Sequence, residues 1–269
     1  MACLPGTSES MPSFAGGDGW RDYHKRVRPL PPDIPLRVAE QIADHEARVL
    51  LLGVTRDLAE LGDDLTAVDF CREQIDHVWI GDRPGRRAIL ADWREMDLLA
   101  GHFTAAIGDG SFSTLAWPED YRRALERIAA SLAPGGLLVV RCFLAPDEPE
   151  DLHRLLDDVR AGRATNFFGA RWRIGMALAA SGNVAVAAIY DEFERAFPDR
   201  DRLASTTGWS RETIDLIDAY RDSELVYSFL TRQELLATLT DTFTRARLVS
   251  SGDYPRSERY PLLVAERRA

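Results

Sequence analysis

The sequence lacks the cysteine patterns that build disulfide frameworks and zinc sites. It holds three cysteines, Cys3, Cys71 and Cys142, which is an odd number, and no two of them form a C-x-x-C pair. Because disulfides need paired cysteines and zinc sites need clustered ligands, the pattern argues against both. We therefore expect no bound metal and a reduced, cytoplasmic setting.

Long apolar runs, a secretory signal and an excess of positive charge are also missing. No apolar run reaches the ~18 residues of a membrane-spanning helix, and no basic flank precedes an apolar segment at the N-terminus. The net charge is −10, from 33 basic and 43 acidic residues. Since non-specific nucleic-acid binding relies on basic faces, we expect neither a nucleic acid nor a membrane as partner.

Strands and helices alternate from Arg48 onward. Apolar runs predict strands at 48–52, 65–69, 87–91, 103–108 and 137–143, with helical segments between them. This alternation is typical of an α/β protein with a doubly wound, mostly parallel sheet. Two more strands are predicted at about 245–250 and 261–266, joined by a hairpin-like connection, which makes seven.

Three helices have clear sequence signals. One is predicted from Pro35 to His45. Another, over 118–132, has Pro118 at its first position and stops at a Pro-Gly-Gly turn. A capping box formed by Thr231 and Glu234 opens the third.

The chain is expected to divide into four segments. Residues 1–19 are small and polar and are predicted to be disordered. Residues 20–144 are predicted to hold the N-terminal helices and the ligand-binding half of the α/β domain. Residues 145–230 break the strand–helix rhythm and predict a helical insertion or lid over the ligand crevice, with helices at 149–162, 167–190 and 210–221. Residues 231–269 complete the sheet.

The strand 48–52 runs directly into Gly53, where a missing Cβ lets the backbone turn tightly and approach a ligand. The second strand ends in Asp69, roughly 16 residues later, near the ~20 expected between a glycine turn and a ribose-binding acid. This arrangement predicts an adenosine-containing cofactor. Asp69 is also a good helix N-cap, which is the structural alternative.

The order of five strand–helix units, a Pro-Gly-Gly turn, a helix and a terminal hairpin resembles the class I S-adenosylmethionine-dependent methyltransferases. The resemblance covers roughly residues 45–144 and 225–269 and implies a Rossmann-like fold, S-adenosyl-L-methionine as cofactor and methyl transfer. One departure is clear, because the turn has a single glycine where the family usually has alternating glycines.

The resemblance also implies roles for individual residues. In the family, the glycine turn contacts the methionine part of the cofactor, and the acid ending the second strand binds both ribose hydroxyls. An acid after the third strand contacts adenine. The segment after the fourth strand lies beside the reactive methyl. The implied cofactor-binding residues are Gly53, Val54, Thr55, Asp69, Phe70, Asp92, Trp93, Asp109, Gly110 and Tyr23.

Several of these residues have alternative interpretations. Asp92 is also a candidate helix N-cap, and Trp93 either flanks the adenine ring or packs at the edge of the core. Asp109 is a candidate for contact with the amino group or sulfonium of the cofactor, for a catalytic base, or for a tight turn. Catalytic residues cannot be assigned, because methyl transfer mainly requires alignment of the acceptor.

Candidate acceptor residues come from two segments. Trp20, Tyr23 and His24 are candidates to close over the cofactor, with His24 a weak candidate base. Six residues of the insertion, with a mix of aromatic and arginine side chains and one asparagine, would suit an aromatic or carboxylate-bearing acceptor; they are Asn166, Phe167, Phe168, Trp172, Arg173 and Tyr190.

Three functions follow in order of preference. The first is a methyltransferase that modifies oxygen or nitrogen of a small molecule. The second is a non-catalytic, methyltransferase-like cofactor-binding or partner subunit. The third is a nicotinamide-dependent oxidoreductase, which is disfavoured because G-x-G-x-x-G is absent. The oligomeric state is not predicted.

Overall fold

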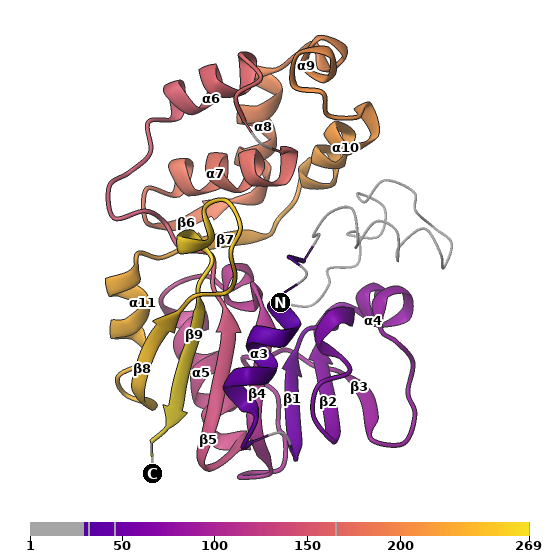
Figure 1. The fold of residues 1–269 in the computed structure, drawn as a ribbon, viewed down its shortest axis with the longest axis vertical. Helices are drawn as coiled ribbons and strands as arrows, with labels where there is room; N and C mark the ends of the chain where they lie inside the picture. Colours follow the sequence, from indigo (N-terminus) through magenta and orange to yellow (C-terminus); the bar gives the residue numbers. More distant parts are fainter. Residues whose placement is uncertain (1–29, 32, 46, 165, 269) are drawn as a thin grey trace.

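The structure, a computed structural model, describes residues 30–31, 33–45, 47–164 and 166–268. Its main sheet has seven strands in the order β3-β2-β1-β4-β5-β9-β8 and fills the lower half of Figure 1. Strand β9 runs antiparallel to both neighbours, and the pairings among the first five strands are parallel. The strands are β1 (Arg48–Leu52), β2 (Asp64–Asp69), β3 (Arg86–Leu90), β4 (Phe103–Asp109), β5 (Leu132–Arg141), β8 (Phe243–Val249) and β9 (Leu262–Arg267).

Helices cover both faces of this sheet, so its central strand β1 is apolar throughout. Val49 and Leu51 share one hydrophobic cluster with α3, while Leu50 and Leu52 share another with α5. Alternate side chains of a strand point to opposite faces, and both faces are buried here. The helices beside the sheet are α3 (Ile34–Ile42), α4 (Arg72–Val78), α5 (Glu119–Ser131) and α11 (Arg232–Thr238).

The predicted fold class is confirmed, and the first four predicted strands agree with β1–β4 to within one residue. The predicted capping box of Thr231 is present at the start of α11. Strand β5 begins at Leu132, five residues before the predicted strand 137–143, because Leu132 pairs with Phe103 across a register shift.

The insertion between β5 and α11 forms the upper half of Figure 1. It is built from helices around its own hydrophobic cluster, with a two-stranded antiparallel sheet, β6 and β7, nearest the main sheet. Its elements are α6 (Leu152–Arg160), α7 (Phe167–Ala179), β6 (Gly182–Ala185), α8 (Val186–Ala196), α9 (Arg200–Thr207), α10 (Arg211–Asp215), η3 (Leu216–Tyr220) and β7 (Val226–Phe229).

The predicted helix over 167–190 is wrong. Helix α7 ends at Ala179, and Ala180 and Ser181 adopt φ angles of 47° and 68°, which a right-handed helix cannot continue. Gly182 then opens β6, and it pairs with Phe229. Because that partner is distant in sequence, local periodicity did not reveal the strand.

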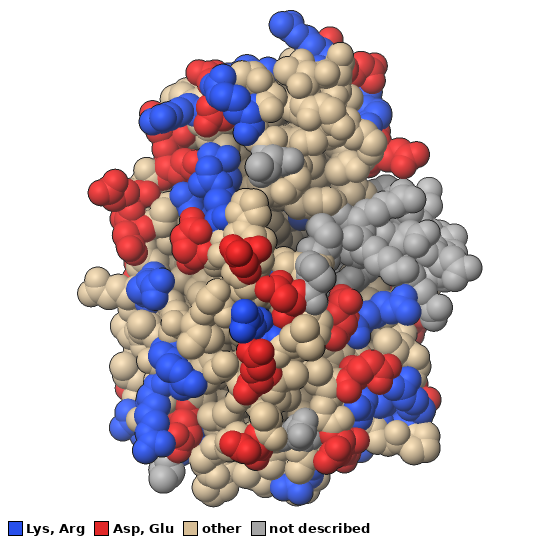
Figure 2. Space-filling model, in the orientation of Figure 1, with Lys and Arg blue, Asp and Glu red and all other residues tan. Residues whose placement is uncertain are grey.

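Charges of both signs are interspersed over the face of the molecule shown in Figure 2. Within the described ranges, each helix is too short or too polar to cross a membrane. The predicted disorder of residues 1–19 falls outside the described residues.

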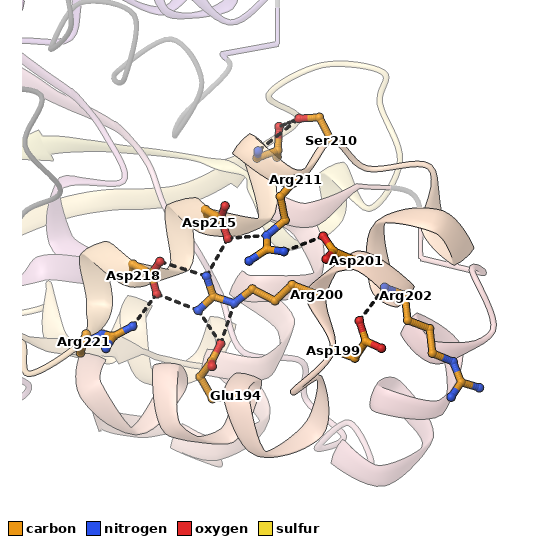
Figure 3. Close-up of polar contacts among 11 residues, drawn as sticks. Glu194, Asp199, Arg200, Asp201, Arg202, Ser210, Arg211, Asp215, Asp218 and Arg221 are labelled. Atoms are coloured by element: carbon orange, nitrogen blue, oxygen red, sulfur yellow. Dashed lines mark hydrogen bonds and ion pairs between the residues drawn. The ribbon is translucent and has the colours of Figure 1, made fainter.

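Arg200 joins three elements of the insertion through ion pairs. It opens α9 and is 9% exposed. Its guanidinium group lies among the carboxylates of Glu194, Asp215 and Asp218, at N–O distances of 2.6, 2.7 and 2.7 Å (Figure 3). The cluster therefore ties α9 to α8, α10 and η3.

Arg171, in contrast, is buried and forms no ion pair with a carboxylate of the described residues. It is 1% exposed, and its Nε and Nη1 atoms have no hydrogen-bond partner. Four aromatic rings surround the guanidinium, and the nearest, Tyr220, has its centroid 4.6 Å from the guanidinium carbon. Cation–π contacts are worth about 0.5–2 kcal/mol each, whereas burying an ion costs several kcal/mol. The charge of Arg171 is thus incompletely compensated within the fold.

We expect Arg200→Met to destabilise the protein by about 2 kcal/mol, between the values for exposed and buried ion pairs. This corresponds to a fall in Tm of about 4–8 °C. Arg202→Met is the matched control, because this neighbour on α9 is exposed and points away from the cluster (Figure 3). Equal Tm values for the two variants would show that the cluster does not stabilise the insertion.

The same pair of proteins tests a pH dependence. The hydrogen bond from Arg200 lowers the pKa of the Asp218 carboxyl below its ordinary value. A lowered folded-state pKa stabilises the fold above the unfolded pKa of ~3.9, and this contribution is lost as the pH falls through the folded-state pKa. The difference in Tm between wild type and Arg200→Met should therefore narrow as the pH falls below about 4.

Candidate functional site

The predicted cofactor residues gather at the carboxyl edge of the sheet. The strand order reverses between β1 and β4, and in such sheets ligands bind in the crevice at this point. All of the predicted residues within the described ranges follow β1, β2, β3 or β4 or end one of them. Tyr23, with Trp20 and His24, lies outside the described residues.

Gly53 and Asp69 are neighbours at this edge. The amide of Gly53 donates to the carbonyl oxygen of Val68 at 2.8 Å, and its φ of 100° is in the region that favours glycine. Among the described residues, a Cβ added at Gly53 would meet only the Oδ2 atom of Asp69, at 3.8 Å. The single glycine therefore leaves open a space beside a carboxylate, which fits the ribose and methionine parts of the implied cofactor.

The turn after Gly53 is packed against the sheet. Val54 is 3% exposed and belongs to the hydrophobic cluster on the α3 side, and Thr55 is 6% exposed. The side chain of Val54 thus fills the core, so its contact with a ligand would have to come from the backbone.

The carboxylate of Asp69 also organises the next turn. It is 8% exposed and accepts a hydrogen bond from the amide of Cys71 at 2.8 Å. Cys71, rather than Asp69, is the N-cap residue of α4. The alternative role of Asp69 as that N-cap is therefore wrong, and its ribose contact stays a prediction.

Asp92 and Trp93 are held by contacts within the protein. Both carboxylate oxygens of Asp92 accept from the Nε atom of Arg94, at 2.9 and 3.0 Å. Burial raises the pKa of the Asp92 carboxyl. Trp93 is 5% exposed, and its Nε1 atom donates to the carbonyl oxygen of Val68 at 2.7 Å. Its ring meets the Phe70 ring edge-on, with 6.2 Å between the ring centroids. Trp93 thus packs in the core, and any adenine contact of these residues stays a prediction.

Asp109 is engaged in a buried ion pair. It is 2% exposed, and it accepts a hydrogen bond from Arg141, whose side chain is 7% exposed. The two residues end the adjacent strands β4 and β5, and the amide of Gly110 donates to the carbonyl oxygen of Arg141 at 2.8 Å. Sequence alone did not suggest this pairing.

Ser111 closes the edge from the other side. Its Oγ atom donates to the carbonyl oxygen of Leu52 at 2.8 Å, which links the end of β1 to the loop after β4. Gly108 makes room for this bond, because a Cβ there would come within 2.5 Å of Ser111 Oγ.

A cavity of about 400 Å³ lies beside Arg141. Four of the residues predicted to meet the acceptor, Asn166, Phe168, Trp172 and Arg173, line it. Phe167 instead packs in the core of the insertion and is 1% exposed. The ring of Tyr190 lies under Arg221, with its centroid 5.0 Å from the guanidinium carbon. These last two predictions of acceptor contact find no support in the geometry.

Sequence reasoning missed several cavity residues. Arg141 ends an apolar strand at the edge where ligands bind, and this position was a usable signal. Phe143 follows two residues later, and the other three come from the loop before β9 and had no local signal; the missed residues are Arg141, Phe143, Tyr254, Arg256 and Tyr260.

Residues 53–140 match a protein-family model described as a methyltransferase domain. The matched segment runs from the glycine turn to the end of β5 and includes Asp69, Asp92 and Asp109. No curated protein matches the sequence.

Solved structures are similar in fold. A Rhodobacter sphaeroides protein, whose name assigns it provisionally to the Zn-dependent alcohol dehydrogenases, has 18% identity and a TM-score of 0.62, with 99% of each chain covered. The Burkholderia thailandensis 1,6-didemethyltoxoflavin-N1-methyltransferase has 17% identity and a TM-score of 0.49, covering 94% of this chain and 82% of that one. The N-methyltransferase NodS from Bradyrhizobium japonicum has 13% identity and a TM-score of 0.49, with 95% of each covered.

At 18% identity, the likeness to the Rhodobacter protein shows the fold alone. The name of the Rhodobacter protein implies zinc, but the described part of this chain contains no group of three His, Cys, Asp or Glu side chains that could hold a metal ion.

We expect Asp109→Asn to cost about 3–5 kcal/mol of unfolding free energy, because it leaves the Arg141 guanidinium buried beside a neutral amide. Urea unfolding without any ligand measures this loss. Asp241→Asn, at an exposed position, is the control. Unchanged stability of Asp109→Asn, with only cofactor affinity reduced, would contradict the structural role of the ion pair.

Proposed function

We propose that residues 53–140, which match a family model described as a methyltransferase domain, form the cofactor-binding part of a class I S-adenosylmethionine-dependent methyltransferase, and that the protein methylates an oxygen or nitrogen atom of a small molecule. The observation that carries the proposal is the space beside Gly53 and Asp69, at the strand-order reversal and within the matched segment. When bound, S-adenosylmethionine would supply a methyl group on positive sulfur, which passes to the acceptor oxygen or nitrogen as the carbon–sulfur bond breaks, S-adenosylhomocysteine leaves and the acceptor gives up a proton.

The chain's part in this reaction is to bind, orient and exclude water. We assign the ribose hydroxyls to the Asp69 carboxylate and the methionine part to the backbone after Gly53. Phe70, Asp92 and Trp93 would border the adenine. Asp109 would act mainly through Arg141, by holding the ends of β4 and β5 together beside the reacting groups.

The cavity beside Arg141 is the proposed acceptor site. Its volume of about 400 Å³ is within the usual range for a small-molecule site. One wall comes from α7 of the insertion and another from the loop before β9. The insertion would thus act as the lid that shields the acceptor from water.

Calorimetric titration with S-adenosylmethionine, S-adenosylhomocysteine and NAD tests the cofactor. We expect micromolar binding of S-adenosylhomocysteine and no binding of NAD. Binding of NAD alone would overturn the proposal and favour an oxidoreductase. Incubation of the enzyme with S-adenosylmethionine and a metabolite pool should then release S-adenosylhomocysteine; cofactor binding without release would favour a non-catalytic subunit.

We expect Asp69→Ala to weaken S-adenosylhomocysteine binding at least tenfold, about 1.4 kcal/mol, through loss of the ribose contact. Asp69→Asn keeps an oxygen for the Cys71 amide, so it separates the ribose contact from the turn. Asp64→Ala, at the exposed other end of β2, is the matched control and should bind as the wild type does. Wild-type affinity in a folded Asp69→Ala protein would refute the ribose assignment.

A further inference from the structure

The lining of the cavity beside Arg141 has an unusual charge for this chain. The protein carries a net charge of −10, yet the described part of the lining holds three arginines and no Asp or Glu. The lining residues are Pro31, Arg141, Phe143, Ala164, Asn166, Phe168, Gly169, Ala170, Trp172, Arg173, Tyr254, Pro255, Arg256 and Tyr260.

Two of these arginines form ion pairs with carboxylates outside the lining. Asp109 pairs with Arg141. Glu150 accepts from Arg173 Nε at 3.0 Å and lies 3.3 Å from Arg259 Nη1. With Arg256 at the rim, the described residues thus place four guanidinium groups beside the two carboxylates of Asp109 and Glu150, and these six groups together carry two positive charges in excess. Such an excess favours an anion in the cavity.

A further positive charge lies behind the cavity wall. The guanidinium carbon of Arg171 is 5.8 Å from the ring centroid of Phe168 and 5.4 Å from that of Trp172, and both rings line the cavity. Arg171 is 1% exposed, and two of its nitrogen atoms lack hydrogen-bond partners. An anion in the cavity would supply a counter-charge that the fold itself does not provide.

The start of helix α7 reinforces this field. Asn166, Gly169 and Ala170 at its N-terminus line the cavity, and its first turn has no acidic residue. The amide groups of a helix N-terminus carry partial positive charge and attract anions.

The remaining walls are aromatic. The Phe143 ring meets those of Trp172 and Tyr260 edge-on, at centroid distances of 4.8 and 5.3 Å, and Tyr254 stacks on Tyr260 at 6.5 Å. Aromatic side chains in offset or edge-on arrangements complement a planar ring better than a flexible chain. The cavity therefore combines a slot for a ring with a cationic rim.

We propose that this cavity binds a planar aromatic carboxylic acid, with the carboxylate read by Arg173 and Arg256 and the ring held among Phe143, Trp172 and Tyr260. The proposal rests on the proposed methyl transfer for the fate of this ligand, which is then the acceptor. The carboxylate is the recognition group, so methylation falls on another substituent of the ring.

Salicylate and its neutral analogue salicylamide are suitable probes, followed by calorimetry on the full chain. We expect salicylate to bind at least tenfold more tightly than salicylamide. Arg256→Gln removes one exposed charge from the lining and should reduce salicylate affinity at least fivefold while leaving salicylamide binding unchanged. Arg127→Gln removes one exposed charge from α5, outside the lining, and should change neither.

Arg171→Met tests the charge behind the wall. We expect a folded protein whose preference for salicylate over salicylamide falls at least threefold, which a purely structural role would not produce. If this variant does not fold, Arg256→Gln still decides the question. Equal binding of the two probes by the wild type, or equal losses in Arg256→Gln and Arg127→Gln, would overturn the proposal.

Titration with S-adenosylhomocysteine on the same samples separates this proposal from the proposed function. Cofactor binding without a salicylate preference overturns the anion site alone. A salicylate preference without cofactor binding overturns the methyltransferase function alone and leaves the anion site supported.

Discussion

The buried ion pair between Asp109 and Arg141 is the contact on which the arrangement of the site depends. It joins the ends of β4 and β5, and these strands belong to different parts of the site. The strands before it present the glycine turn and Asp69, whereas Arg141 itself lines the cavity. Because both charges are buried, neither can turn toward solvent without losing its partner. The ion pair thus adds to the β4–β5 strand pairing that holds the proposed cofactor and acceptor sites side by side.

The insertion shows two ways of burying an arginine. Arg200 is surrounded by three carboxylates and ties α9 to its neighbours, so its charge contributes to the stability of the fold (Figure 3). Arg171 has four aromatic rings around it and no carboxylate partner among the described residues, so its charge is a cost to this part of the fold. A charge kept at such a cost is consistent with a ligand that compensates it, because functional sites commonly sacrifice stability.

Local patterns predicted most of the sheet. Continuous apolar runs such as Arg48–Leu52 mark strands that are buried on both faces, and a capping box marks the start of α11. The pattern failed where distant partners decide the structure. Strand β6 exists because Gly182 pairs with Phe229, and β5 is extended because Leu132 pairs with Phe103. Neither pairing can be predicted from the pattern of apolar and polar residues in its own segment.

The sequence by itself determined the fold class, the glycine turn and the acid that ends β2, because these depend on neighbours within a few residues and on strand–helix order. Only the tertiary structure decided what the side chains of the site contact. It pairs Asp109 with Arg141, engages Asp92 with Arg94 and buries Trp93 against Val68. It also gathers arginines from β5, α7 and the loop before β9 around one cavity. Charge complementarity and ring packing act through space, so residues far apart in the chain acquire these roles only when the fold brings them together.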